Sequence, residues 1–577
     1  MSPIRMPSQA VEVNPAGAKA GFLARSAVAA LCLTLLIGIG IVRIVSTYRV
    51  FNHTIDEPSH LACGLEWWEK GVYRIETKHP PLARISIAAL PYMSGLRAPA
   101  EFKSWQETYP VLSADGHYWR NLWLARIGVL PYYVICTLVV FFWTRRLFGT
   151  TAGLLAAAVF SMAPPVLAHS AVATTDVPLA AMFCWALYAF TLWLERPDWR
   201  RAAALGVASG LAVATKFSTL LFLPACAVAI LALYLVGGGQ RNWRVLLRTA
   251  VLAALCALLS IWAVYRFSHA PLAQVTAVPD RLAARAFGSS SPMTAAVHKI
   301  AAIVPIPAPE LIDGVRVLRQ QNNEGTRSYL LGRIKEGGFW YFFVVALALK
   351  TPLAALILGA LGAVAALGRY SRDHADWQIA APLASAIMIL VITAPAGMNS
   401  GVRHVLPEYV FLSIYAGLGM VALWRRSVHA TLYRALAVML LSWMTLSSAI
   451  AHPDYLAYFN EFGGSDPSRL LVISDLDWGQ DLTRLAKYLR ENHIDHISIA
   501  YEGFYDPASL DLPETVKLKC GDMPTGWVAV AARRARRSPE CEPWLQGHQR
   551  VTIVGKTMWI YNIPANAQGA NLAHPVQ

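Results

Sequence analysis

Charged side chains are scarce in this chain. Asp, Glu, Lys and Arg make up 15% of its 577 residues, whereas a soluble protein carries roughly a quarter. The scarcity excludes an ordinary soluble protein, and the apolar residues come in runs of about 18 to 25 that are typical of membrane-spanning helices. The sequence shows no internal repeat, and its glycine-rich VGGGQ segment lacks the strand–turn–helix context of a nucleotide-binding loop. We therefore expect an α-helical polytopic membrane protein.

No small-residue cleavage site follows the first apolar run, SAVAALCLTLLIGIGIVRIV. We interpret this run as a retained span rather than a signal peptide, preceded by a cytoplasmic N-terminus at 1–22. Lys350 and Pro352 lie inside the eighth apolar run, which favours a surface helix followed by a shorter span. About eleven spans are expected, near 23–46, 121–143, 150–168, 171–194, 202–216, 218–236, 246–266, 339–366, 377–396, 404–424 and 433–450.

Arginine is concentrated in short connections between the predicted spans. These are TRRLFG, ERPDWRR, GGQRNWRVLLR, GRYSRDHADW and WRRSVHATLYR. Counting spans puts all of them on one side, which the positive-inside rule makes cytoplasmic. The net charge of +15 therefore sets topology and does not indicate nucleic acid. The chain divides into a transmembrane domain at 23–450, with outer loops at 47–120 and 267–338, and an outer domain at 451–577; in a bacterium this is the periplasmic face of the inner membrane.

The tail at 451–577 is not membranous. The segments RLLVISD, HISIAYEG, GWVAVAARR and VTIVGKTMWIYNI have the pattern of strands, and DLTRLAKYLREN that of an amphipathic helix. We expect a small C-terminal α/β domain. Cys520 and Cys541 both lie in this tail, an oxidising location, so we expect them to form a disulfide; two free thiols are the alternative.

Two acids stand side by side directly after the first span. Asp56 and Glu57 lie in HTIDEPSHLACG, and Pro58 stiffens the chain behind them. Trp67 and Trp68 follow, which suits a membrane interface or a platform for a sugar ring. A solvated pair of surface acids is the alternative to a functional role.

Asp176 lies about five residues into the fourth predicted span, roughly 8 Å below the outer surface at 1.5 Å per residue. An ionisable group inside a span is costly and is a functional candidate by default. The alternative is an ion pair with an arginine that only joins two helices. Because its depth is level with the loop that carries Asp56, the two acids can converge on one site.

Several cationic or imidazole side chains are expected on the outer side. A cation at the membrane surface suits a phosphate group, and arginine is the stronger ligand because of its planar fork. Lys216 and Lys350 have snorkelling to the interface as their alternative. The candidates are Lys78 and His79 before a Pro-Pro step, Lys216, Lys350, and Arg403 and His404 at the start of the tenth span.

An acidic cluster and a basic run occur in the tail. SDLDWGQDL combines Asp475, Asp477, Gln480 and Asp481 with a tryptophan, a set that can bind a sugar or a cation. It can equally be the acidic start of the helix that follows. The run RRARR at 533–537 is interpreted as a solvated basic segment, with contact to anionic lipid headgroups as the alternative.

The order of these features resembles the GT-C superfamily of membrane glycosyltransferases. Within it, the chain is most similar to family 39, the protein O-mannosyltransferases and lipid A aminoarabinose transferases. The resemblance covers roughly residues 20 to 240 most strongly, and the tail looks like that of a bacterial branch. The matching features are the Asp56–Glu57 pair, KHPPLARI, Asp176 and the ATKFS segment around Lys216.

The resemblance implies transfer of a sugar from a polyprenyl-phosphate donor on the outer face, with inversion at the anomeric carbon. It implies that Asp56 is the general base, that Glu57 orients the site or is the alternative base, and that Asp176 is a second acid. Lys78, Lys216 and Arg403 become phosphate contacts, and Arg84 fills a place where the family often has a basic residue. Asp56 and Asp176 can share a divalent metal, as in some members, but no sequence motif completes a ligand set, so no cofactor is required.

The expected partners are the lipid bilayer, a polyprenyl-phosphate hexose or pentose, and an acceptor in lipopolysaccharide, another envelope glycan or protein. Two alternatives from other classes are weighed. A lipid or glycolipid transporter would place its charges near the bilayer midplane, often with inverted repeats. A non-catalytic subunit of an envelope polysaccharide machine would have no need of Asp56, Glu57 and Asp176 together.

Overall fold

The structure is a computed structural model that describes residues 26–98, 105–239, 242–275, 278–519, 522, 524–538, 541, 545 and 547–564. The predicted cytoplasmic segment 1–22 and Cys520 lie outside these residues. Within them, eight helices are long and apolar enough to cross a membrane, and one bent pair makes a ninth. The eight spans are α1 (Ser26–Val45), α4 (Tyr118–Ile127) continued by α5 (Leu130–Phe148), α8 (Asp176–Glu195), α10 (Thr219–Val236), α11 (Trp243–Val264), α17 (Leu353–Tyr370), α18 (Trp377–Thr393) extended by η3 (His374–Asp376), and α20 (Ala430–Ile450).

The remaining predicted spans coincide with shorter or broken helices. The bent pair is α6 (Thr150–Met162) and α7 (Pro164–Ser170), which meet at 64° because proline at 164 cannot continue the hydrogen-bonding of α6. The fifth and tenth predicted spans are α9 (Trp199–Val213) and α19 (Glu408–Trp424), of 15 and 17 residues. The eighth divides at Pro352 into α16 (Phe342–Lys350) and α17, as its sequence indicates.

Glycine allows α9 and α11 to pack closely. A Cβ at Gly206 would lie 2.3 Å from the carbonyl oxygen of Ala253, and one at Gly210 would lie 2.5 Å from that of Ala257. Small residues at such contacts let membrane helices approach and gain van der Waals packing where no hydrophobic driving force acts.

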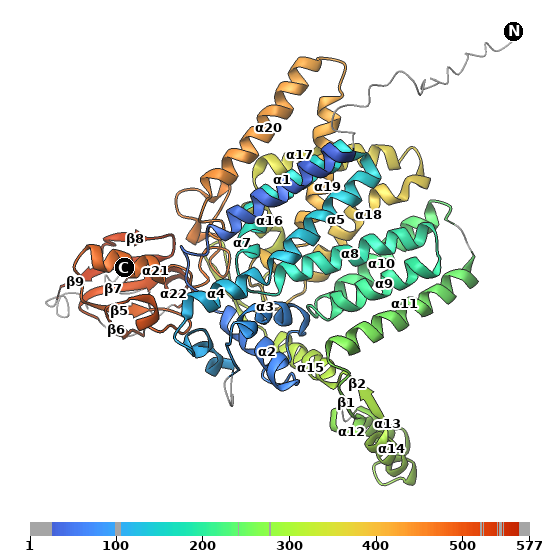
Figure 1. Ribbon diagram of the computed structural model, residues 1–577, viewed down its shortest axis with the longest axis horizontal. Helices are drawn as coiled ribbons and strands as arrows, with labels where there is room; N and C mark the ends of the chain where they lie inside the picture. Colours follow the sequence, from blue (N-terminus) through green and yellow to red (C-terminus); the bar gives the residue numbers. More distant parts are fainter. Residues whose placement is uncertain are drawn as a thin grey trace, which may run out of the picture.

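The large connections gather at one end of the bundle, opposite the arginine-rich turns (Figure 1). The first contains α2 (Glu57–Lys70), α3 (Leu82–Met93) and η2 (Trp105–Ser113). The second contains β1 (His269–Pro271), α12 (Leu272–Val275), α13 (Val278–Phe287), α14 (Pro292–Ile303), β2 (Pro305–Pro307), α15 (Pro309–Glu324), β3 (Arg327–Leu330) and β4 (Arg333–Glu336). A third, short connection carries η4 (Val402–Val405) into α19.

The tail forms the predicted small α/β domain. Its five strands lie in the order β6-β5-β7-β9-β8, with β5 parallel to both neighbours and the other pairs antiparallel. The strands are β5 (His496–Ala500), β6 (Glu514–Lys517), β7 (Gly526–Ala531), β8 (Thr552–Val554) and β9 (Met558–Ile563). The helical segments are η5 (Glu461–Gly463), η6 (Pro467–Arg469), α21 (Leu482–Glu491), η7 (Ala508–Leu510) and α22 (Ala532–Arg537).

Two expectations for the tail are wrong. Residues 469–475 run from the end of η6 through irregular chain into a turn at 474–475 instead of forming a strand, because their polar groups bind the loop before η4 and Ser474 adopts a positive φ of 49°. The basic run at 533–537 is not simply solvated. Arg533 lies 2.7 Å from a carboxylate oxygen of Glu502, and Arg536 lies 2.8 Å from one of Asp466, so the helix α22 is fixed by ion pairs.

Candidate active site

The two adjacent acids have different surroundings. Asp56 is the residue before α2, and its side chain is 33% exposed. Glu57 is the first residue of α2, and its side chain is 1% exposed. Successive residues at the start of a helix point about 100° apart. Asp56 can therefore remain partly exposed beside Arg403 while Glu57 points into the protein.

Glu57 is fully bound by hydrogen-bond donors. Its Oε1 accepts from Arg126 Nε at 2.8 Å and from Ala173 N at 2.8 Å, and its Oε2 accepts from Thr54 N at 2.7 Å and Arg126 Nη2 at 3.0 Å. Burial alone raises the pKa of Glu57, but Arg126 and the two backbone donors bring that pKa below its ordinary value. A carboxylate held ionised by four donors is a poor proton acceptor, so Glu57 fits a positioning role.

Glu57 and Arg126 join three separate segments. Arg126 also donates to the carbonyl oxygens of Phe51 and Asn52 in the first loop, at 3.0 and 2.8 Å. Through Ala173 the same pair fixes the turn that precedes Asp176. Arg126 was not among the predicted site residues, although an arginine inside the predicted span 121–143 is the same kind of signal that singled out Asp176.

Asp56, Asp176, Lys216 and Arg403 form one cluster. Arg403 Nη1 donates to Asp56 Oδ2 at 3.0 Å and lies 3.6 Å from Asp176 Oδ2. Lys216 Nζ donates to Asp176 Oδ1 at 2.6 Å. Two carboxylates are thus joined by one guanidinium, and a second cation neutralises the buried acid. The structure brings together four predicted residues that lie far apart in the sequence.

Asp176 lies at the end of its helix instead of several residues inside it. The predicted span begins at 171, but α8 begins at Asp176 because residues 171–175 form turns. Thr174 Oγ1 donates to Asp176 Oδ2 at 3.2 Å. The N-terminal position favours a negative charge there, since the helix dipole and the unbonded N–H groups of the first turn stabilise it.

The tail holds Arg403 in place. The Arg403 guanidinium carbon lies 4.3 Å from the centre of the Trp478 ring, a cation–π distance. Asp475 Oδ1 accepts a hydrogen bond from Val402 N at 2.9 Å, and Ser474 Oγ donates to the carbonyl of Ser400. The predicted acidic cluster therefore faces the loop that carries Arg403.

Asp477 and Gln480 form hydrogen bonds within the tail. Asp477 accepts from the backbone N–H groups of Gly479 and Arg533, and burial raises its pKa to about 6. Gln480 accepts from Trp478 N and donates to the carbonyl of Leu476. The polar atoms of Asp477 and Gln480, which we predicted to bind a sugar or a cation, are therefore hydrogen-bonded within the tail instead.

The predicted basic loop is organised around Arg84. Its guanidinium is buried and donates to His60 Nδ1 at 3.0 Å, to Tyr73 Oη at 2.7 Å and to the Glu76 carbonyl at 2.8 Å. Burial and the charge of Arg84 hold the pKa of His60 well below its usual value. Burial and Arg84 do the same to His79, whose ring centre is 5.3 Å from that of His60. Lys78 is 26% exposed, with Nζ 3.8 Å from Glu76 Oε2.

His404 is influenced by the cations of the cluster, whereas Lys350 binds the tail. The His404 ring stacks on Phe343, and burial, Lys216 and Arg403 hold its pKa well below its usual value. Lys350 lies apart from the cluster. Its Nζ donates to the carbonyls of Leu456 and Asp475, so it joins α16 to the tail and does not face the acids.

The acids do not form a metal site in this arrangement. Among the described residues, no group of three or more His, Cys, Asp or Glu side chains is placed to hold a metal ion. Arg403 contacts Asp56 and Asp176 where a shared divalent cation would have to bind. The residues therefore do not fit a shared metal.

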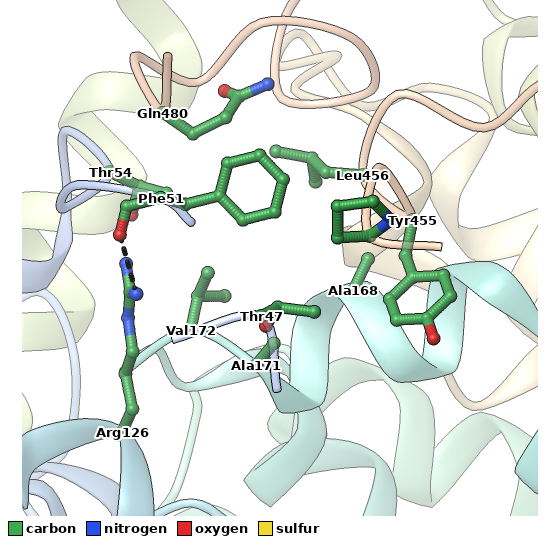
Figure 2. Close-up of a pocket in the computed structure, with 11 residues that line it drawn as sticks. Thr47, Phe51, Thr54, Arg126, Ala168, Ala171, Val172, Tyr455, Leu456 and Gln480 are labelled. Carbon is green, nitrogen blue, oxygen red and sulfur yellow. Dashed lines mark hydrogen bonds between the residues drawn. The ribbon is translucent and has the colours of Figure 1, made fainter. Parts of the chain in front are cut away.

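A small, mostly apolar cavity lies between the first loop, α7 and the connection into the tail (Figure 2). Phe51, Leu456 and Val172 supply its apolar lining, and Arg126 reaches its edge. Val172 also packs in a buried group with Ile55 and Trp478, and Trp478 in turn lies under Arg403. The cavity is thus lined by residues of both the membrane domain and the tail, where the two meet.

Comparisons with known proteins relate the chain to glycosyltransferases. The model of the family "dolichyl-phosphate-mannose-protein mannosyltransferase" matches residues 119–265. The oligosaccharyltransferase of Archaeoglobus fulgidus tethered to an acceptor peptide is similar in fold, with a TM-score of 0.50 and 12% identity over 94% of this chain and 75% of that one. A search of curated protein sequences gives no match.

Two further solved structures are similar at lower scores. ArnT from Cupriavidus metallidurans bound to undecaprenyl phosphate has a TM-score of 0.46 and 14% identity, over 93% of this chain and 99% of that one. The S. cerevisiae Pmt1-Pmt2 protein O-mannosyltransferase complex bound to its sugar donor has a TM-score of 0.33 and 16% identity, over 41% of this chain and 33% of that one. The comparisons confirm the expected resemblance to GT-C glycosyltransferases and the GT-C type of membrane fold.

Proposed function

We propose that this chain is an inverting glycosyltransferase that moves a sugar from a polyprenyl-phosphate donor to an acceptor hydroxyl at the outer face of the inner membrane. The observation that carries the proposal is the cluster of Asp56, Arg403, Asp176 and Lys216, which lie near the ends of α2, α19, α8 and α9. The matched family, named for a dolichyl-phosphate-linked sugar donor, supports a lipid-linked donor here. Because nucleotide sugars are cytoplasmic, an outer-face enzyme needs such a donor.

Arg403 and Lys216 fit the phosphate of the donor. In the structure they neutralise Asp56 and Asp176, and a donor phosphate would compete for the same guanidinium and ammonium protons. Lys78, at the outer surface, is a further candidate contact. Cations placed at the leaving phosphate stabilise the charge that develops when the glycosidic bond breaks.

Asp56 is then the proposed general base. It is the partly exposed acid, and it loses its Arg403 partner when the phosphate binds that guanidinium. Asp56 takes the proton of the acceptor hydroxyl, the hydroxyl oxygen bonds to the anomeric carbon, and the bond from that carbon to the phosphate oxygen breaks. The products are the glycosylated acceptor and the polyprenyl phosphate, with the configuration inverted.

The substrate classes follow from the location of the cluster. A hexose or pentose carried on polyprenyl phosphate would reach it from the bilayer. An acceptor in lipopolysaccharide, another envelope glycan or a protein would reach it from the periplasmic side, on which the domain at 451–577 would also lie. The transmembrane domain at 23–450 would then carry the catalytic residues.

The test is transfer of label from radiolabelled polyprenyl-phosphate sugar in membranes that contain the wild type or a variant. Asp56→Asn should abolish transfer while the protein still inserts, since the amide cannot accept the proton. Asp511→Asn, a change to an exposed tail acid, is the matched control and should transfer normally. Wild-type turnover by both Asp56→Asn and Asp56→Ala would overturn Asp56 as the base.

The acceptor is identified in cells. Mass spectrometry of surface glycans and proteins from a deletion strain should show the loss of one sugar mass from one acceptor class. An unchanged set of glycans and glycoproteins, together with altered lipid distribution across the membrane, would instead support a transporter.

A further inference from the structure

A helical hairpin projects from the outer end of α11. The strands β1 and β2 pair to form its base, with His269 opposite Pro307, and α12, α13 and α14 lie beyond them. Figure 1 shows the hairpin projecting below the helical body, beyond α15. Its helices pack on one another and on β1.

The outward side of this hairpin is apolar. On α14, Met293, Ile300 and Ile303 have 55%, 60% and 78% of their surface exposed. Positions i, i+7 and i+10 fall on one side of a helix, so these side chains form a single face. Leu282 and Phe287 of α13 are 59% and 54% exposed. Exposed large apolar side chains gathered on one element mark a contact surface.

Basic residues outnumber acidic ones in the hairpin, where Asp280 of α13 is the one acid in the sequence from 272 to 309. Arg281, Arg285 and Lys299 are exposed. An amphipathic helix with apolar side chains on one face and basic residues beside it is typical of segments that lie in the headgroup region of a bilayer.

The apolar face continues a surface that already faces lipid. The outward side of the span α11 exposes Val251, Leu255, Leu258 and Leu259, between 53% and 62% each. Phe267, directly after this span, is 51% exposed. The hairpin begins only a few residues later, so it starts at the outer boundary of the bilayer.

We propose that the α13–α14 hairpin lies in the outer leaflet interface, with Met293, Ile300 and Ile303 among the acyl chains and its cations at anionic lipid headgroups. Neither helix, of 10 and 12 residues, is long enough to span a bilayer, which takes about 20 residues. Because the apolar face continues the exposed apolar side of α11 and has cations beside it, we assign the lipid leaflet as its occupant. The inference depends on the membrane orientation of the chain and not on the transfer reaction.

The hairpin is connected to the site through α15. Thr77 Oγ1 donates to Asp313 Oδ2 at 2.7 Å, and a Cβ at Gly314 would lie 2.2 Å from the Thr77 carbonyl oxygen. The helix α15 therefore rests against the loop that carries Lys78. A hairpin fixed in the leaflet would set the height of that loop relative to the lipid headgroups.

The experiment places an environment-sensitive NBD label on the full chain in nanodiscs. The background carries Cys32→Ser and Cys256→Ser, because these are the described free cysteines that are not buried. One variant carries the label at Ile300→Cys. The matched control carries it at Ala302→Cys, an exposed residue about 200° further round the same helix.

The nanodiscs contain phosphatidylglycerol and a doxyl-labelled lipid. The label at position 300 should show blue-shifted emission and loss of intensity from doxyl quenching, and the label at 302 should show neither. Equal, water-like emission at both positions would overturn the proposal. Shielding at 300 from both doxyl lipid and aqueous iodide would also overturn it, because a protein surface would then cover the face.

The proposed contact between the hairpin cations and anionic headgroups is tested with a separate variant. Replacing Arg281, Arg285 and Lys299 by Gln should reduce quenching at position 300 in phosphatidylglycerol nanodiscs and leave it unchanged in phosphatidylcholine nanodiscs. Equal quenching of the parent in both lipids would overturn the role of anionic headgroups. Sugar transfer is not measured, so failure of the proposed function leaves these outcomes unaffected.

Discussion

Arg403 donates a hydrogen bond to Asp56 at 3.0 Å, although 347 positions separate the two residues in the chain. The same guanidinium lies 3.6 Å from Asp176. A single side chain therefore joins the first outer loop to the start of α8. This contact places both acids beside the cation that we propose as a ligand of the phosphate leaving group.

Replacement of Arg403 should affect transfer more than stability. Arg403→Gln should reduce kcat by about a hundredfold or more, in line with the loss of one charge-stabilising group from an active site. Arg403→Lys should recover only part of it, because an ammonium lacks the planar fork that reaches both acids. The measurement is steady-state transfer with polyprenyl-phosphate sugar, and equal kcat for Arg403→Gln and wild type would contradict the prediction.

Replacement of Glu57 should affect stability first. Glu57→Ala leaves Arg126 buried without its counter-charge, which costs about 3 to 5 kcal/mol in comparable buried pairs. Thermal unfolding in detergent should therefore show a clearly lower Tm. The double variant Glu57→Ala/Arg126→Met should recover part of the loss, because no unpaired charge remains. A Tm equal to that of wild type for Glu57→Ala would show that the pair is not a structural link.

Trp478 should act on transfer through Arg403. Trp478→Leu removes the ring beneath the guanidinium, and Trp478→Phe retains an aromatic face that binds a cation less strongly. We expect kcat to fall in the order wild type, Phe, Leu, with the KM for acceptor unchanged. The retained Tm of the Phe variant serves as the folding control. Equal losses for Phe and Leu, with a lower Tm in both, would indicate a packing role alone.

Asp477 should make stability depend on pH. Burial raises the pKa of Asp477 from 3.8 to about 6, so between these values the folded protein holds a proton that the unfolded chain has lost. Stability from this group is complete below pH 4 and declines as pH rises to about 6, by about 3 kcal/mol in total. The Tm of wild type should fall across this window more than that of Asp477→Asn. Parallel curves for the two would show that Asp477 does not titrate there.

The tail disulfide is tested by peptide mapping. Cys541 is disulfide-bonded, and the six cysteines at 32, 63, 136, 184, 226 and 256 are free. We expect a non-reduced digest to yield one peptide pair that links positions 520 and 541. Its closed loop of about twenty residues would contribute roughly 3 kcal/mol. Recovery of the 520 peptide with an alkylated thiol would contradict the prediction.

The helical architecture was predictable because its signals are local. Apolar runs of membrane length, arginine-rich connections and the Pro352 break are all visible in the sequence, and each predicted span coincides with a helix or a helix pair. The start of α8 was predicted five residues too early. Hydropathy measures how apolar a segment is and not its backbone conformation, so it does not distinguish the turns at 171–175 from the helix that follows. The supposed strand at 469–475 failed because its polar groups bind a loop distant in sequence.

The sequence by itself determined a membrane-spanning helical protein, because membrane insertion depends on length, hydrophobicity and charge along the chain, and it predicted acids and cations on one side of that protein. Only the tertiary structure decided which of those charged side chains are buried in ion pairs and which meet in the cluster. Folding buries Glu57 against Arg126 and leaves Asp56 beside Arg403, and it separates Lys350 from the cluster that Lys216 joins. Adjacent residues acquire different chemistry because burial and partners, and not sequence order, set the energy of a charge.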